Sequence, residues 1–303
     1  MFALELQNLK KTYENGFQAL KNINLQVKKG CFFGLLGANG AGKSTTINII
    51  SHLIPKTSGH VIINGFHLDK QTSRAKASIG IVPQEYNLPI FETTETILIN
   101  AAGYQGISRS KALPRAHWLL DEVGLGDKKD TIVYRLSGGM KRRLMIARSL
   151  IHQPELLILD EPSAGVDVEI RHSIWDFLKT MNQAGTSIIL TTHYLEEAEQ
   201  LCDEVAIIHH GDIVEQASLE HLFRNQTQQT YVIHTKDAMP EIPLHSGTAR
   251  WLTPKSFEID IHMKNSLNPL FIELESHHIQ IANVAPKTNR LEALFMELIR
   301  DEH

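Results

Sequence analysis

Hydrophobic and polar positions follow two different rhythms along this chain, and together they predict its elements. Residues 3–9 and 23–27 alternate at every second position, as strands with one buried face do. Residues 31–36 are an unbroken apolar run that predicts a buried strand, and a helix is expected from Gly42 to Leu53. Further strands are expected at residues 58–65, 79–82, 156–159, 187–190 and 205–208, and helices at 170–182 and 195–202. Strands that alternate with helices predict an α/β fold with a mostly parallel sheet covered on both faces.

Between residues 85 and 135 the strand pattern disappears and helical spacing replaces it, for example at Trp118, Leu119 and Val123. We interpret this stretch as a helical subdomain inserted into the domain that holds the sheet. The alternation of strands and helices resumes after it, so residues 1–224 are predicted to form one large domain.

A short polar stretch, residues 225–229, is interpreted as a linker to a smaller domain at residues 230–303. Residues 257–263 alternate as a half-buried strand, residues 267–274 carry helical spacing, and residues 279–284 predict another strand. An amphipathic helix follows, with an apolar stripe of Leu291, Leu294, Phe295, Leu298 and Ile299. This β-α-β-α order indicates a small α+β domain, and the stripe can serve either its core or a self-association face.

Composition narrows the class of protein. The chain has 303 residues and is 42% hydrophobic, which is enough for a large core and a small extra domain. Its formal charge of −4, from 30 basic and 34 acidic residues, argues against a sequence-independent nucleic-acid binder. Two cysteines in apolar stretches fit a reducing compartment, and the N-terminus does not resemble a signal peptide. No apolar run approaches the roughly 18 residues that span a bilayer, so a membrane role requires a partner.

A glycine-rich loop follows the predicted strand at residues 31–36. Its pattern, Gly37-x4-Gly42-Lys43-Ser44, matches the phosphate-binding loop of nucleotide enzymes. Glycines let backbone N–H groups converge on phosphate oxygens, and the next helix adds its positive N-terminal end. Lys43 is expected to reach the β- and γ-phosphates, and Ser44 is expected to hold Mg²⁺. The predicted nucleotide-binding residues here are Gly37, Asn39, Gly40, Ala41, Gly42, Lys43, Ser44 and Thr45.

Three other strands also end in polar residues. Asp160 ends the strand at residues 156–159 and is expected to bind Mg²⁺, while Glu161 stands next to it. Gln84 follows the strand at residues 79–82, and His193 follows the strand at residues 187–190. We expect the side chains of Asp160, Glu161 and His193 to face the phosphate site.

The sequence Leu136-Ser137-Gly138-Gly139-Met140 lies between the phosphate loop and the Asp160 strand. In this combination the chain resembles the ATP-binding subunit of an ABC transporter over its first three quarters. The resemblance implies an ATPase that uses ATP and Mg²⁺, with the fold of P-loop NTPases and an N-terminal antiparallel β subdomain. It also implies that two subunits sandwich two ATP molecules, and that Ser137, Gly138 and Gly139 of one subunit donate to the phosphate bound by the other. Met140 departs from the commoner glutamine, which puts only an outer contact in doubt.

The resemblance also implies roles for single residues. Glu161 would be the general base that takes a proton from the attacking water. Gln84 would contact Mg²⁺ or that water and sense the membrane partner. His193 would bind the γ-phosphate, and Tyr13 would stack on adenine.

Residues 192–199 and the extra C-terminal domain look most like the ATPase subunits of ABC-2-type systems, which are often exporters of drugs, lipids or polysaccharides. This implies a cytoplasmic subunit, peripheral on the inner face of the cell membrane, with a separate integral-membrane permease and a second copy of itself as partners. Lys141-Arg142-Arg143 is interpreted as a solvated or phosphate-facing helix face, so no nucleic acid is expected. Two alternatives stay open: a soluble ABC ATPase acting on the ribosome or nucleic acid, or one in cofactor-cluster assembly. The cargo is not encoded here.

Overall fold

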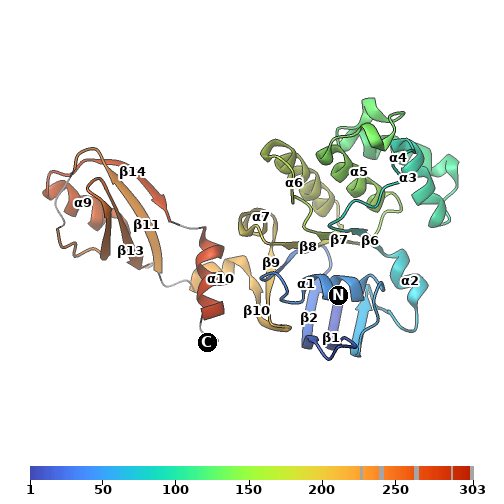
Figure 1. Cartoon of the computed structure of the whole chain (residues 1–303), viewed down its shortest axis with the longest axis horizontal. Coiled ribbons are helices and arrows are strands. Elements are labelled where there is room, and N and C mark those ends of the chain that lie inside the picture. The colour runs from blue at the N-terminus through green and yellow to red at the C-terminus, as the bar shows by residue number, and fades with distance from the viewer. Residues whose placement is uncertain (226–227, 239–241, 263–265, 288, 301–303) are drawn as a thin grey trace. The chain divides into compact units, whose positions relative to one another are not determined.

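The computed structural model describes residues 1–225, 228–238, 242–262, 266–287 and 289–300, with the side chains of residues 225, 228 and 296–300 excepted. The chain divides into two compact units, Met1–Ser218 and Leu219–His303 (Figure 1). The first unit contains two sheets and the second contains one. The predicted α/β fold with a small α+β domain is confirmed.

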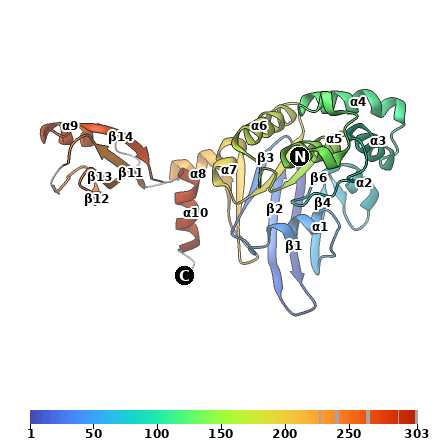
Figure 2. The same cartoon turned by 45° about the horizontal axis from the view of Figure 1, so that its top comes forward.

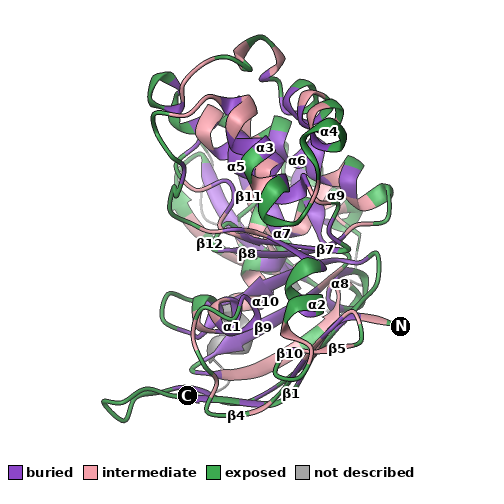
Figure 3. Ribbon diagram, turned by 90° about the vertical axis from the view of Figure 1, so that its right-hand side faces the viewer, coloured by how far each residue is buried: buried purple, intermediate pink, exposed green. Residues whose placement is uncertain are grey.

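A six-stranded sheet forms the centre of the first unit. From edge to edge its strands are β10 (Asp212–Ser218), β9 (Glu204–His209), β3 (Phe32–Leu36), β8 (Ser187–Thr192), β7 (Leu156–Asp160) and β6 (Ile79–Val82). All neighbouring strands run parallel except β9 and β10, which are antiparallel. The apolar runs of β3, β7 and β8 are buried, as expected of strands that are covered on both faces (Figure 3).

Helices cover both faces of this sheet. The helices of the first unit are α1 (Lys43–Ile50), α2 (Thr72–Ala77), α3 (Thr94–Tyr104), α4 (Arg109–Glu122), α5 (Gly138–Leu150), α6 (Val168–Gln183) and α7 (Leu195–Leu201). α5 and α6 lie on one face and α1 lies on the other (Figures 1 and 3). The first helix is shorter than predicted, since it ends at Ile50 and Leu53 is 71% exposed.

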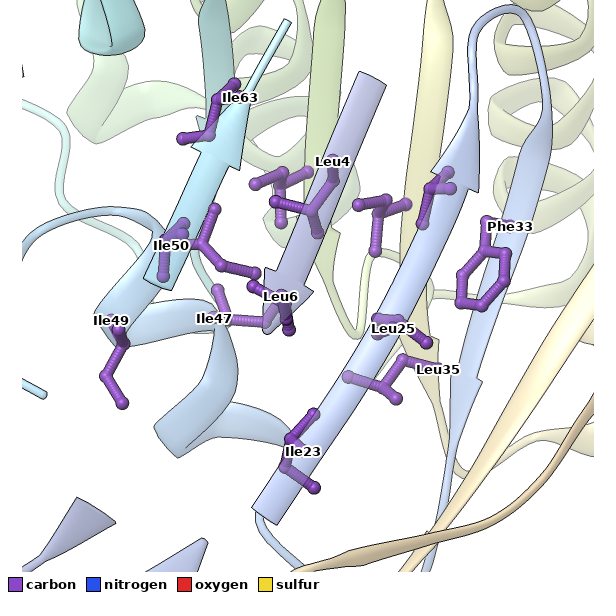
Figure 4. Packing of buried hydrophobic residues seen from close by; sticks show 14 of the residues in the cluster. Leu4, Leu6, Ile23, Leu25, Phe33, Leu35, Ile47, Ile49, Ile50 and Ile63 are labelled. Atoms are coloured by element: carbon purple, nitrogen blue, oxygen red, sulfur yellow. The ribbon is translucent and has the colours of Figure 1, made fainter. Parts of the chain in front are cut away.

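The second sheet of this unit is antiparallel and confirms the predicted N-terminal β subdomain. From edge to edge its strands are β2 (Gln18–Lys28), β1 (Phe2–Thr12), β4 (Ser58–Ile63) and β5 (Phe66–His67). Alternation directs Leu4, Leu6, Ile23 and Leu25 into the core, where Ile47 of α1 packs with them (Figure 4). Each such side chain contributes about 1.5–3 kcal/mol by its burial. This core fixes α1, and therefore the loop before it, between the two sheets.

The stretch predicted as a helical subdomain, residues 85–135, contains α3, α4 and two 3-10 turns, η1 (Gly126–Lys128) and η2 (Val133–Arg135). Thr93 caps α3, because its side chain accepts a hydrogen bond from the N–H of Thr96 at 3.2 Å. α3 packs against α4, and both helices contact α5 (Figure 2). These contacts place α5 between the helical subdomain and the central sheet.

The second unit has more strands than the sequence predicted. Its elements are α8 (Leu219–Asn225), β11 (Gln228–Thr235), β12 (Thr248–Thr253), β13 (Ser256–His262), α9 (Asn268–Ser276), β14 (Ile281–Pro286) and α10 (Arg290–Arg300). The sheet order is β12-β13-β11-β14, and all its neighbours are antiparallel. The predicted β-α-β-α order corresponds to β13 through α10 and omits β11 and β12. Met263, predicted in the first of these strands, lies outside the described residues.

The domain boundary also differs from the predicted position. The first unit ends at Ser218, so α8 belongs to the second unit. Residues 228 and 229 of the expected linker begin β11, and residues 226 and 227 lie outside the described residues. β11 pairs with strands on both of its sides, which explains how a polar segment becomes the centre of a sheet.

Among the described side chains, none of those on the amphipathic C-terminal helix belongs to the core of this sheet. Among the described residues, α9 supplies the helical side chains of that core, Leu270 and Leu274. α10 instead contacts α8. Leu291 and Leu294 of the predicted stripe are buried, whereas the side chains of Leu298 and Ile299 lie outside the described residues.

In the part of the chain that the structure describes, no helix combines the length and apolar character needed to cross a membrane.

The two separate cores generate a prediction for truncated chains. A chain ending at Ser218 should fold and bind ATP with an affinity within about twofold of the full chain, because each unit has its own core. A chain ending at Asn225 keeps α8 without α10, and we expect it to self-associate more through Leu219 and Leu222, which are buried in the full chain. Nucleotide titration and light scattering measure both outcomes. A folded 1–218 chain that bound no ATP would contradict the prediction.

Candidate functional site

Four parallel strands end side by side at one edge of the central sheet. At this edge Leu36 pairs with Thr192, Thr191 with Asp160, and Leu159 with Val82. The loop at Gly37 and the residues Gln84, Glu161 and His193 all follow these strand ends. The register therefore delivers the predicted phosphate loop and three predicted side chains to one place. In open sheets of this type, ligands bind at this carboxyl edge.

A cavity of about 700 Å³ lies at this edge. Most of its lining was predicted from the sequence, but Phe17 and Ala19 were not. Gly37, Ala41, Asp160 and the segment 136–140 are not part of the lining in the described chain. The lining residues are Tyr13, Phe17, Ala19, Asn39, Gly40, Gly42, Lys43, Ser44, Thr45, Gln84, Glu161 and His193.

The glycine-rich loop needs its glycines for space as well as for conformation. A Cβ at Gly37 would lie 2.4 Å from the carbonyl oxygen of Ile208. Gly42 has a φ of 121°, and its Cβ would lie 2.8 Å from Leu20 Cδ2. Each glycine therefore lets the loop sit against neighbouring strands while its N–H groups stay available at the start of α1.

Lys43 lies within the loop and is 6% exposed. Its Nζ donates to the carbonyl oxygens of Gly37 at 2.7 Å and of Ala38 at 3.2 Å. Burial lowers the pKa of Lys43, while the nearby carboxylates of Glu161 and Asp160 act in the opposite direction. The ammonium is thus a desolvated cation that forms part of the cavity wall.

Glu161 follows β7 with a φ of 48°, a left-handed conformation that few non-glycine residues adopt. Its carboxylate accepts a hydrogen bond from Gln84 Nε2 at 2.9 Å, and the other oxygen lies 3.1 Å from His193 Nδ1. These two contacts orient the carboxylate at the cavity wall. Three residues predicted from separate parts of the sequence therefore form one contiguous group.

Asp160 lies one residue earlier, at the end of β7. Its Oδ1 accepts a hydrogen bond from the hydroxyl of Thr191 on β8 at 2.5 Å. Ser44 and Gln84, the other two predicted metal ligands, line the cavity itself. The hydroxyl, amide and carboxylate oxygens of these three residues are the hard donors that Mg²⁺ prefers.

Tyr13 and Phe17 contribute two exposed aromatic rings to the lining, being 37% and 57% exposed. The Tyr13 hydroxyl lies 3.3 Å from the hydroxyl of Thr45. Phe17 belongs to no recognisable motif. Its position four residues after Tyr13 in the sequence is the one signal that could have identified it as part of the cavity lining.

The segment 136–140 forms the N-terminal end of α5. Ser137 caps this helix, because its hydroxyl oxygen accepts a hydrogen bond from the N–H of Met140 at 3.3 Å. Ser137 and Gly138 are exposed, whereas Gly139 is buried against Ile170 of α6. The exposed N–H groups and the hydroxyl proton of Ser137 are therefore presented to the outside of this subunit.

The interpretation of Lys141-Arg142-Arg143 as a solvated or phosphate-facing helix face is wrong for Arg142. Arg142 is 2% exposed, and its guanidinium donates to backbone carbonyls of two different loops. Burial lowers its pKa. A charged run on a helix gives no sign that one of its members points inward, since carbonyl acceptors have no sequence signature.

Comparison with known proteins agrees with this geometry. The family model for ABC transporters matches residues 20–164. The linearmycin resistance ATP-binding protein LnrL of Bacillus subtilis (strain 168) is 36% identical, over 97% of this chain and 97% of its own. The chain belongs to the ATP-binding subunits of ABC transporters. It is accordingly an ATPase, and the family, fold and enzyme class predicted from the sequence are confirmed.

Other members of the ABC family match to different extents. The daunorubicin/doxorubicin resistance ATP-binding protein DrrA of Streptomyces peucetius is 31% identical, over 98% of this chain and 92% of its own. The methionine import ATP-binding protein MetN of Helicobacter pylori (strain ATCC 700392 / 26695) is 40% identical, but over 73% of this chain and 69% of its own. The dimeric post-hydrolysis structure of the ATP-binding cassette MJ0796 with ADP and Pi is 29% identical over 71% of this chain and 98% of that chain, with a TM-score of 0.66.

The two glycines at the start of α5 generate a prediction for an ABC ATPase. A Cβ at Gly139 would lie 2.4 Å from Ile170 Cδ1, whereas a Cβ at Gly138 would lie 3.4 Å from the Tyr86 hydroxyl. Gly139→Ala should destabilise the protein by about 1 kcal/mol, because the Ile170 side chain must leave its rotamer to admit the added methyl group. Gly138→Ala is the matched control and should leave the unfolding temperature nearly unchanged. Thermal unfolding of the two variants measures the difference in stability between them. Equal unfolding temperatures for Gly139→Ala and Gly138→Ala would refute the packing argument.

Proposed function

We propose that this chain is one of two identical ATP-hydrolysing subunits of an ABC-2-type exporter, held on the cytoplasmic face of the cell membrane by a separate integral-membrane permease. LnrL and DrrA, whose matches extend through the second unit, are both named as resistance proteins. The match to the import protein MetN covers 73% of this chain. Similarity across the second unit therefore favours export over import.

The proposed ATP hydrolysis rests on the position of the Glu161 carboxylate. It lies between Gln84 and His193 in the wall of the cavity that Lys43 also lines. A nucleotide in this cavity would place its β- and γ-phosphates against Lys43 and the start of α1. Glu161 would take the proton of the water that attacks the γ-phosphate. His193 uses Nδ1 on Glu161, which leaves Nε2 for the γ-phosphate.

Ser44, Gln84 and Asp160 would hold Mg²⁺. Gln84 donates to Glu161 through its amide nitrogen, so its amide oxygen remains for the cation. The donor set of hydroxyl, amide and carboxylate oxygens suits Mg²⁺. When bound, the ion would neutralise phosphate charge that builds up during transfer.

Tyr13 and Phe17 would bind the adenine. Both rings are exposed in the lining, and the Tyr13 hydroxyl is within reach of Thr45 in the phosphate loop. Aromatic stacking holds a base with little discrimination between bases, because every base has a π-face. ATP would therefore be preferred over GTP only through contacts other than stacking.

Ser137, Gly138 and Gly139 would serve the nucleotide of a second copy. Among the described residues they do not line the cavity of their own subunit, and Ser137 and Gly138 are exposed at a helix N-terminus. Such an end offers N–H donors and a partial positive charge to an anion. This arrangement supports a dimer in which each subunit completes the other's site.

The assigned general base generates a prediction. Glu161→Gln should keep ATP affinity and lower turnover by at least about 10²-fold, because an amide cannot accept the proton. It should also accumulate an ATP-bound dimer. Steady-state hydrolysis and light scattering with Mg-ATP measure both effects.

Glu155→Gln is the matched control for this variant. Glu155 precedes β7, at the opposite end of the strand from Glu161, and its carboxylate pairs with Lys29 at 2.7 Å. It should hydrolyse ATP at the normal rate. Turnover of Glu161→Gln within a few-fold of the Glu155→Gln rate would remove Glu161 from its proposed role.

The exporter assignment is tested in membranes of the source organism. Affinity purification of the tagged chain from detergent-solubilised membranes should recover an integral-membrane protein, and loss of the chain should raise cellular sensitivity to at least one compound in a panel of antibiotics. Complementation with Glu161→Gln should fail to restore resistance. Recovery of ribosomal RNA without a membrane protein would instead support the alternative of a soluble ATPase.

A further inference from the structure

Arg142 connects the two loops that carry Gln84 and Glu161. Its Nη1 donates to the carbonyl oxygens of Pro83 at 2.7 Å and Gln84 at 3.0 Å. Nη2 donates to Asp160 O at 2.8 Å and to Glu161 O, and Nε donates to Pro162 O at 2.8 Å. A guanidinium has five N–H groups, and all five find acceptors here.

These acceptors belong to the residues whose side chains meet in the cavity wall. Arg142 donates hydrogen bonds to the main-chain carbonyls of Gln84 and Glu161, while the side chains of these two residues hydrogen-bond each other at 2.9 Å in the cavity wall. Glu161 is held in its left-handed conformation, which costs about 1–2 kcal/mol for a non-glycine residue. Without the guanidinium, the carbonyl at the end of β7, two carbonyls after it and two after β6 would lose this donor, and the loops could separate.

The same helix holds the segment after Gln84 at two further points. The Tyr86 hydroxyl donates to the carbonyl oxygen of Gly138 at 3.1 Å. Arg148 Nη1 donates to the carbonyl oxygen of Asn87 at 3.1 Å. Helix α5 therefore has the exposed Ser137 at its N-terminal end, and residues along the helix hold the loop that contains Gln84 by hydrogen bonds.

We propose that Arg142 is a positioning residue for ATP hydrolysis in its own subunit, setting the distance between Gln84 and Glu161. It touches neither nucleotide nor water and acts through the two main chains. The proposal rests on the proposed roles of Gln84 and Glu161. Because Arg142 and Ser137 share α5, a shift of this helix that closes the partner's site would also adjust the site of its own subunit.

Variants of adjacent arginines test the proposal. Arg142→Met should lower kcat by about 10²-fold, the cost of misplacing a catalytic group by about 1 Å, with KM for ATP within about twofold. Arg142→Lys should also lose activity, because one compact ammonium cannot serve both loops, and it provides a second variant if Arg142→Met folds poorly. Arg143→Met is the control, since Arg143 donates to Val123 O at 2.9 Å, away from both loops.

Thermal unfolding is measured for all three variants. A folded Arg142→Met protein with kcat within about threefold of the Arg143→Met value would overturn the proposal. Equal loss of ATP affinity and kcat would also overturn it, because a general packing defect affects the phosphate loop as well. Full rescue by lysine would assign the effect to charge alone and contradict positioning.

Mixed dimers separate the two roles of α5. When one chain carries Ser137→Arg, the single complete site combines the phosphate loop and Glu161 of that chain with Ser137 of the other. Arg142→Met on the Ser137→Arg chain should remove the remaining activity, whereas on the other chain it should leave most of it. Equal loss from either chain would refute action within its own subunit. If the Ser137→Arg mixed dimer itself were inactive, the paired-site function would fail, and the single-chain comparison with Arg143→Met would still decide the role of Arg142.

Discussion

The parallel register of β3, β8, β7 and β6 is the constraint on which the site depends. Each of these strands ends at the same edge, and the polar residue that follows each one emerges into the same space. A slip of one residue in β7 would turn Glu161 away from Gln84 and His193, because successive side chains alternate between faces. The apolar side chains of the strands, buried between α1 and α5, make such a slip unfavourable. The packing of the core and the arrangement of Gln84, Glu161 and His193 therefore both depend on this register.

Helix α5 combines an exposed beginning with a buried middle. Its first turn presents Ser137 and Gly138 to solvent, while Arg142 lies fully inside. Burying a guanidinium costs several kcal/mol unless its donors are all satisfied, and here backbone carbonyls satisfy them. A helix held in this way cannot tilt without disturbing the two adjacent loops that carry Gln84 and Glu161. In the proposed dimer, the physical link between Ser137, which would donate to a neighbouring subunit, and Glu161 of its own subunit would thus be a single helix.

The sequence predicted the parts of the molecule whose chemistry depends on local pattern. The phosphate loop, the Asp160–Glu161 strand end and the segment 136–140 are each encoded within a few residues, and the family they indicate is confirmed. The role of Arg142 could not be predicted, because its partners are backbone carbonyls of loops that are remote in the sequence. Phe17 was not predicted either, because a single aromatic residue before a strand belongs to no sequence motif. The first two residues of β11 were interpreted as linker because they are polar, whereas the strand is stabilised by neighbours on both of its sides. Two residues of the α10 stripe, Leu291 and Leu294, are buried, but periodicity does not identify the element that α10 contacts, which is α8.

The charges around the cavity show why an anion belongs there. Lys43 is desolvated by the loop, and this burial lowers its pKa even though Glu161 and Asp160 are close. A phosphate beside Lys43 would stabilise the ammonium again, because an opposite charge at short range in a poorly solvated place interacts strongly. Glu161 would meanwhile be repelled by the same phosphate, and the hydrogen bond from Gln84, together with the contact to His193 Nδ1 at 3.1 Å, opposes that repulsion. The cavity therefore favours an anion on the Lys43 side and keeps a proton acceptor on the other, which is the separation that hydrolysis of a phosphate anhydride requires.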